Sequence, residues 1–133
     1  MNKRIYLQPK TYSQFDANHV LVYLNEEVIE NYVPEDAPED FKPMTGYAYS
    51  GDMPDGGTLI EADANNRDSM INGIIRSSYS QTEEDAIKTH QLIRLEDPEC
   101  EKANEYASEW AAFKVQRENA INLVNGWLGY SER

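Results

Sequence analysis

A long stretch without glycine or proline, residues 99–125, most constrains what this chain can fold into. Glycine and proline both interrupt helices, glycine through its conformational freedom and proline through its missing backbone donor. Asp97 and Pro98 stand just before the stretch and are typical of a helix N-cap and first turn. The sequence therefore predicts a helix of about 28 residues, which at the usual rise per residue would be roughly 42 Å long.

Two shorter helices are predicted before it, because from about residue 65 the apolar residues recur at helical spacing. The first would begin at an asparagine N-cap, Asn65 or Asn66. Its apolar face consists of Met70, Ile71, Ile74 and Ile75. Ser80 and Glu83 have the spacing of a capping box, so the second helix is expected to start there and to end near residue 95.

Aromatic residues of the last helix are the most informative candidates for function. The last two helices are expected to form a helical hairpin, whose core would use aromatic and alanine side chains. The alternative is that the aromatics form a binding surface, since tryptophan and tyrosine dominate the energetics of protein interfaces. Trp127, beyond Gly126, is the better candidate to face a partner. The candidate partner-binding residues are Trp127, Tyr130, Trp110 and Phe113.

The first half of the chain is predicted to be rich in strands. Short runs of β-branched and aromatic residues alternate with turn-forming residues, which is typical of antiparallel sheets. The predicted strands cover residues 4–8, 19–24, 28–33, 44–50 and 58–62. Residues 34–43 contain three prolines and four acidic residues and are expected to be a loop.

Residues 19–33 allow two interpretations. A short polar gap between two apolar runs favours a β-hairpin. Leu21, Leu24, Val28 and Tyr32 also recur at helical spacing, so a helix remains the alternative.

The fold class that follows is α+β, with an N-terminal antiparallel β-rich half and three helices after it. The β-rich half covers residues 1–62 and the helical half residues 65–128. A chain of 133 residues has the size of one ordinary domain, so we expect a single domain over 1–133.

The composition excludes some classes of partner. The chain carries 24 acidic and 12 basic residues, a net charge of −12. Nucleic-acid binding normally needs a basic surface, so we expect no nucleic-acid partner. A protein partner with a basic surface is compatible with this charge. No apolar run approaches the length that spans a bilayer or serves as a signal peptide, so no membrane association is expected.

The stretch GDMPDGGT, residues 51–58, has the glycines of a phosphate-binding loop. It lacks the lysine of that motif, Asp52 and Asp55 would repel phosphate, and a strand is predicted after it instead of a helix. The spacing of oxygen-bearing residues also fails for an EF-hand. We expect a wide turn between two antiparallel strands, with Gly56 or Gly57 at positive φ. A weak cation site at Asp52 and Asp55 is left open.

No catalytic or metal constellation is predicted, and no cofactor. Cys100, His19 and His90 have spacings that match no zinc motif. Acidic residues surround Cys100 and oppose formation of a thiolate. His90 lies on the inner side of the second helix and is interpreted as a structural histidine. No nucleophile with a base and an orienting acid is recognisable, so we expect no enzyme activity.

Residues 53–120 resemble small proteins encoded by phages and prophages of gut bacteria. The matching pieces are Asp55–Ala62, Ile75–Ser80, Asp85–Ile87 and Tyr106–Trp110. They are caps, turns and core positions, so the resemblance transfers no catalytic residue. It implies a virion-associated or tail-assembly protein in the cytoplasm of the bacterial host or on the virion.

The function expected from these observations is that of a non-enzymatic structural or tail-assembly protein. It would act through protein–protein contacts, by self-association or with another virion protein. The alternative is a small-ligand or carbohydrate-binding module, in which tyrosines of the β-rich half stack on the ligand. The tyrosines concerned are Tyr6, Tyr23, Tyr32, Tyr47 and Tyr49.

Overall fold

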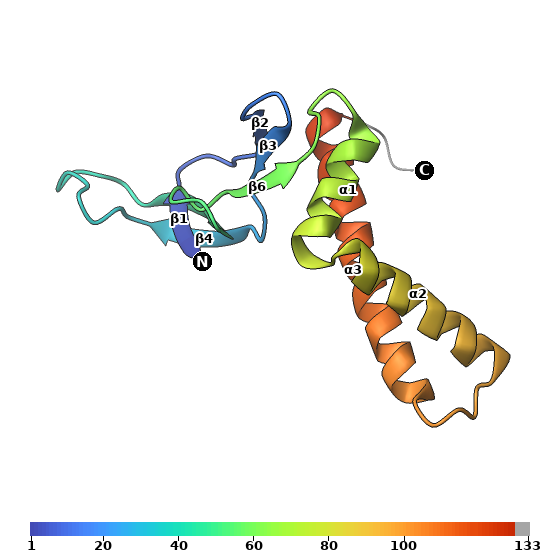
Figure 1. The fold of residues 1–133 in the computed structure, drawn as a ribbon. Helices are drawn as coiled ribbons and strands as arrows, with labels where there is room; N and C mark the ends of the chain where they lie inside the picture. Colours follow the sequence, from blue (N-terminus) through green and yellow to red (C-terminus); the bar gives the residue numbers. More distant parts are fainter. Residues whose placement is uncertain (130–133) are drawn as a thin grey trace. The chain divides into compact units, whose positions relative to one another are not determined.

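The computed structural model describes residues 1–129, which form six strands followed by three helices (Figure 1). The predicted α+β class, with its β-rich half first, is confirmed. The chain divides into two compact units, Met1–Ala64 and Asn65–Arg133. The boundary falls inside the predicted gap between the two halves. That the whole chain acts as one domain stays a prediction.

One three-stranded antiparallel sheet has β5 (Met44–Gly51) at its centre. β1 (Asn2–Tyr6) pairs along one edge of β5 and β4 (Glu27–Tyr32) along the other. The register of β4 shifts between Ile29 and Tyr32, where Asn31 has a φ of 54°. The strands predicted at 4–8, 28–33 and 44–50 therefore exist, with shifted ends.

The second three-stranded sheet has β3 (His19–Val22) at its centre, between β2 (Tyr12–Gln14) and β6 (Thr58–Glu61). Val20 lies opposite Ile60 in the register of β3 and β6, and both side chains are buried. The sequence did not indicate β2, because its three residues carry no apolar alternation.

The predicted hairpin over residues 19–33 is wrong, although both of its strands are present. β3 and β4 belong to different sheets. Asn25 between them has a φ of 58°, but the connection lacks the paired left-handed residues that close a two-residue hairpin. Burial decides the pairing, since β3 reaches the apolar residue of β6 instead of the exposed residues of β4.

Each of the first two helices begins at a side-chain cap. α1 (Arg67–Ser78) starts after Asn66, whose side chain accepts a hydrogen bond from the Ser69 amide. α2 (Gln81–Glu96) starts after Ser80, and the capping box with Glu83 is present in both directions. Both predicted starts are confirmed, because caps act within one turn and can be recognised locally.

The predicted start of the last helix is wrong. α3 spans Ala103–Leu128, 26 residues, and its N-cap Lys102 makes no side-chain hydrogen bond. Asp97 ends α2 instead of beginning α3, because its amide donates to the Ile93 carbonyl. Two turns follow, in which the Cys100 amide donates to the Asp97 carbonyl and the Ala103 amide to the Cys100 carbonyl. These turns reverse the chain, which a hairpin of α2 and α3 requires.

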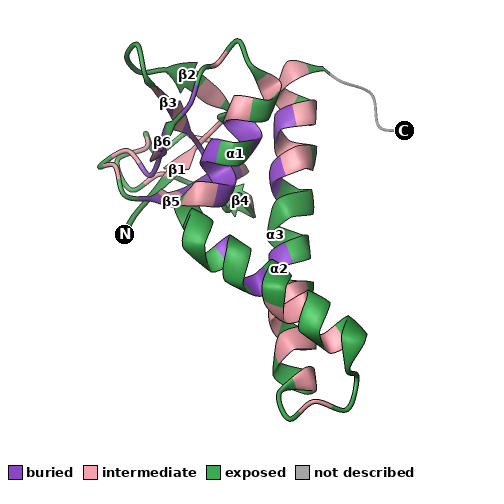
Figure 2. Ribbon diagram, turned by 45° about the vertical axis from the view of Figure 1, so that its right-hand side comes forward, coloured by how far each residue is buried: buried purple, intermediate pink, exposed green. Residues whose placement is uncertain are grey.

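In the helical unit, α3 packs against both α1 and α2, so the predicted helical hairpin of α2 and α3 is confirmed. The unit is buried along α1, at two positions of α2 and on one side of α3 (Figure 2). Its buried apolar residues are Met70, Ile71, Ile74, Ile75, Ile87, Phe113, Ala120 and Val124.

Candidate functional site

A histidine joins the two helices of the hairpin. The ring of His90 on α2 stacks on Tyr106 of α3, with centroids 4.3 Å apart and ring planes 11° from parallel. Its Nδ1 atom lies 2.6 Å from the Oε1 atom of Glu109, also on α3. His90 is half-buried. Its contacts are those of a residue that aligns two helices.

The aromatic candidates on α3 occupy different environments. Phe113 is 1% exposed and packs between Tyr79, at 5.2 Å between ring centroids, and Trp110, at 6.1 Å. Phe113 is therefore part of the core. Trp110 and Trp127 are half-buried, and their role as partner-binding residues stays a prediction. Tyr130 lies outside the described residues.

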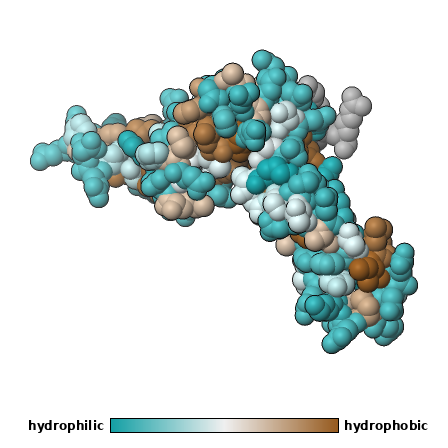
Figure 3. Space-filling model, viewed as in Figure 1, coloured by the Kyte–Doolittle hydropathy of each residue, from teal (hydrophilic) through white to brown (hydrophobic). Residues whose placement is uncertain are grey.

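The outer part of the hairpin has no buried residue between positions 88 and 112, all of which are described (Figure 2). Large apolar side chains nevertheless lie there, with Leu92 62% exposed, Leu95 61% and Ile93 41%. Figure 3 shows apolar surface over the end of α2, the part of the helix that carries these exposed residues. An apolar helix face normally packs against a further layer of structure. Within the helical unit, the described residues supply no such layer over these side chains, which leaves an exposed apolar surface.

Acidic residues are concentrated in the same segment as these leucines. We refer to residues 92–105 as the hairpin end; this segment contains five acidic residues and two basic ones. The acidic residues are Glu96, Asp97, Glu99, Glu101 and Glu105, and all five are exposed. Of the two bases, Arg94 donates to the Gln91 side chain on its own helix. The hairpin end is therefore an apolar patch in a negative field.

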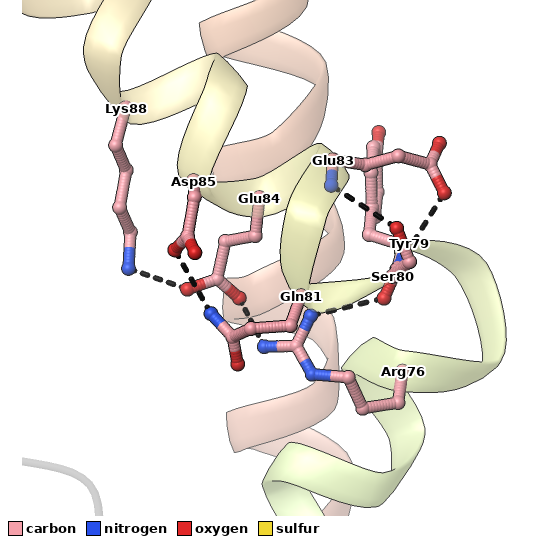
Figure 4. Close-up of polar contacts among 8 residues, drawn as sticks. All are labelled: Arg76, Tyr79, Ser80, Gln81, Glu83, Glu84, Asp85 and Lys88. Atoms are coloured by element: carbon pink, nitrogen blue, oxygen red, sulfur yellow. Dashed lines mark hydrogen bonds and ion pairs between the residues drawn. The ribbon is translucent and has the colours of Figure 1, made fainter.

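A buried carboxylate holds the base of the hairpin to α1 (Figure 4). Glu84 is 7% exposed, and its Oε1 atom accepts a hydrogen bond of 2.5 Å from Arg76, while its Oε2 atom accepts one from Lys88. Arg76 also donates to the Tyr79 carbonyl. Burial raises the pKa of Glu84, but the hydrogen bonds from Lys88 and Arg76 outweigh it and leave the pKa below its usual value.

Three tyrosines of the β unit pack on one another. The rings of Tyr6, Tyr23 and Tyr49 have centroid separations between 5.6 and 6.3 Å. The Nζ atom of Lys10 lies 5.1 Å from the Tyr6 ring and 5.3 Å from the Tyr23 ring, within range of a cation–π interaction. Tyr23 and Tyr49 are buried. These rings form a core, and the half-buried Tyr32 and Tyr47 are the candidate stacking tyrosines outside this cluster.

Asp55 connects this tyrosine cluster to the glycine-rich loop. Its carboxylate accepts hydrogen bonds from the Tyr23 hydroxyl at 2.7 Å and the Gly57 amide at 3.0 Å, and its carbonyl accepts one from Tyr6. The hydrogen bond from Tyr23 is the main reason why the pKa of Asp55 is lowered. Gly56 has a φ of 84°, as the sequence predicts.

Two expectations for this loop change. It joins β5 to β6, which lie in different sheets, so it is not the turn of an antiparallel pair. A cation at Asp52 and Asp55 would have to compete with Tyr23 for the Asp55 carboxylate. Within residues 1–129, no group of three or more His, Cys, Asp or Glu side chains could hold a metal ion.

Sequence reasoning missed the exposed leucines of α2 and the role of Glu84. The spacing of Glu84 and Lys88, one helical turn apart, indicates an ion pair, but the contribution of Arg76 depends on how α1 and α2 meet. Leu92 and Leu95 are apolar residues on a helix, and the sequence does not show that the facing layer is missing.

Comparisons of the chain with protein families, curated proteins and solved structures find no match. The resemblance to phage and prophage proteins is therefore a prediction. Among the described helices, none combines the length and the apolar character needed to cross a membrane.

Proposed function

We propose that this protein is a non-enzymatic structural or assembly protein that binds another protein through the hairpin end. One observation carries the proposal. Residues 88–112, the outer part of the hairpin, contain no buried residue, and the large apolar side chains of Leu92 and Leu95 there are each more than half exposed. Covering two leucines contributes about 1.5–3 kcal/mol each in the fully buried limit. A partner that supplies the third layer would gain that energy.

The charge and the apolar residues of the hairpin end indicate what kind of partner surface would bind it. Five exposed acidic residues lie in the same segment as the exposed leucines, so we expect the complementary surface to combine an apolar recess with lysine and arginine. A second copy of the same surface would bring like charges together, which disfavours pairing of hairpin ends. The proposed partner is therefore a different protein.

The resemblance over residues 53–120 supports assignment of this role to a phage or prophage, as a virion-associated or tail-assembly protein. In that setting the chain would act in the cytoplasm of the bacterial host or on the virion. The gene neighbourhood tests this part separately. A tail-fibre gene beside it is the expected finding, and a metabolic operon would contradict the phage assignment without affecting the hairpin end.

The binding proposal is tested by photo-crosslinking in the cell that carries the gene. A benzoylphenylalanine at position 92 is expected to capture one protein in high yield, and the same group at position 115 is expected to capture little. Val115 is a matched control, because it is an exposed apolar residue on α3, 55% exposed, outside the hairpin end.

The captured protein is then purified and its affinity measured by calorimetry. L92Q/L95Q is expected to weaken binding at least about tenfold, a change of about 1.4 kcal/mol, whereas V115Q should leave it within about twofold. Equal crosslinking from positions 92 and 115, or an affinity that L92Q/L95Q does not change, would contradict the proposal.

A further inference from the structure

A second surface of the helical unit has the features of a small-ligand site. The three helices line a cleft of about 360 Å³, within the size range of small-molecule pockets. Isoleucines from α1 and α3 contribute its apolar part: Ile71, Ile75 and Ile121. Asn72 and Gln81 add amide groups. No residue of the cleft belongs to the hairpin end.

Three of the six arginines in this acidic chain line the cleft. Two of them have acidic partners, since Arg67 pairs with Asp68 and Arg76 with Glu84. Arg117, on α3, makes no hydrogen bond or ion pair with the residues that the structure describes. Both acidic residues of the lining are thus engaged, and the positive charge of Arg117 is uncompensated.

The Nε atom of Arg76 adds a second polar group without a partner. It is buried and has no hydrogen bond within the described part of the chain, although both Nη atoms of the same guanidinium are bonded. An unsatisfied buried donor costs free energy that an acceptor or a water molecule would recover. Arg76 and Arg117 both belong to the lining of the cleft, so its unpartnered charged donors are on arginines.

We propose that this cleft binds a small organic carboxylate whose aliphatic part lies on the isoleucines. Its carboxylate would accept hydrogen bonds from Arg117, since a planar guanidinium matches a carboxylate in shape and charge. The apolar part would lie mainly against Ile121, which is partly exposed, because Ile71 and Ile75 are only 9% and 7% exposed. The proposal is independent of the partner at the hairpin end, because it uses different residues.

The test is a titration of the full-length ¹⁵N-labelled protein followed by NMR. Sodium hexanoate is expected to give saturable shifts at residues 67–76 and 117–121, and hexylammonium chloride, of the same shape and opposite charge, is expected to give none. Inorganic phosphate should bind more weakly than hexanoate, because it lacks the aliphatic part.

Two arginine variants separate the cleft from general charge. R117Q is expected to raise the Kd for hexanoate about tenfold, and R94Q, which removes a guanidinium outside the cleft, should change it less than twofold. Arg117 is exposed, so R117Q should keep the fold. Equal effects of the two variants, equal shifts with hexylammonium, or tighter binding of phosphate than of hexanoate would each overturn the proposal.

Discussion

Tyr49 is a buried member of the tyrosine cluster that donates a hydrogen bond to an acidic side chain, as Tyr23 does. Its hydroxyl donates to Glu26 at 2.7 Å and accepts from the Lys10 amide at 2.9 Å. Burial, followed by the hydrogen bond to Glu26, raises the pKa of Tyr49 to about 12. Because the folded pKa exceeds the unfolded one, this stabilisation is complete below pH 10 and is lost as the pH rises towards 12.

The Y49F variant tests this account. We expect it to cost about 1 kcal/mol at pH 7, the value of one hydrogen bond, and to make stability fall less steeply than in the wild type between pH 10 and 12. Urea unfolding followed by circular dichroism at several pH values measures both effects. Y47F is the control, because Tyr47 is only half-buried. If the stability of Y49F falls as steeply between pH 10 and 12 as that of the wild type, Tyr49 is not the group responsible for this pH dependence.

Glu84 gives the opposite dependence on pH. Its lowered folded pKa means that its contribution is present above the unfolded pKa, about 4.3, and is lost as the pH falls through the folded value. We expect E84Q to lower the free energy of unfolding by about 3 kcal/mol at pH 7, because Arg76 then keeps a poorly paired charge. We also expect the stability of E84Q to fall less steeply than that of the wild type as the pH is lowered.

Tryptophan fluorescence measures this change, since both tryptophans lie in the helical unit. D85N is the matched control, because Asp85 is the exposed neighbour whose side chain accepts a hydrogen bond from Gln81. If E84Q and D85N are equally stable, the anchor between α1 and α2 has been assigned to the wrong residue.

At the level of elements, the capping box should set the stability of the first turn of α2. S80A removes the acceptor of the Glu83 amide and is expected to cost about 1 kcal/mol. S78A, at the exposed end of α1, should cost much less. Amide hydrogen exchange at residues 81–84 should speed up in S80A alone. Unchanged exchange there would show that packing, not the cap, holds this turn.

Signals confined to one helical turn could be predicted from the sequence, and pairings between distant segments could not. The Ser80 cap, the apolar face of α1 and the left-handed Gly56 follow from local chemistry. The partner of β3 depends on which strand buries Val20, so the predicted hairpin was wrong. An aspartate such as Asp97 can accept hydrogen bonds in a turn that follows a helix or in one that precedes a helix. Which of the two roles Asp97 has depends on where the chain reverses, and the local sequence does not show that.

The candidate site was less predictable for a related reason. Aromatic residues identify α3 as important, but burial separates Phe113 from Trp110, and burial depends on neighbours that are far away in sequence. Whether Leu92 is core or surface depends on whether a third layer covers α2. A property of the whole arrangement therefore determines the function of a single residue.

At the scale of the whole molecule, the net charge of −12 is expected to keep the apolar patch from pairing with itself. The wild-type chain should sediment as a monomer at 10 mM and at 150 mM salt. Neutralising the hairpin end with E96Q/E99Q/E101Q leaves Leu92 and Leu95 exposed without the repulsion. That variant should show a concentration-dependent dimer in sedimentation equilibrium.

Two further variants decide whether charge at this position is responsible. Adding L92Q/L95Q to the triple variant should restore the monomer, because the leucines would no longer gain from burial. E35Q/D36N/E39Q removes the same charge from an exposed loop of the β unit and should leave the protein monomeric. If that control also dimerises, total charge and not the hairpin end governs association. If the wild type dimerises and L92Q/L95Q abolishes the dimer, the partner at the hairpin end is a second copy of this chain.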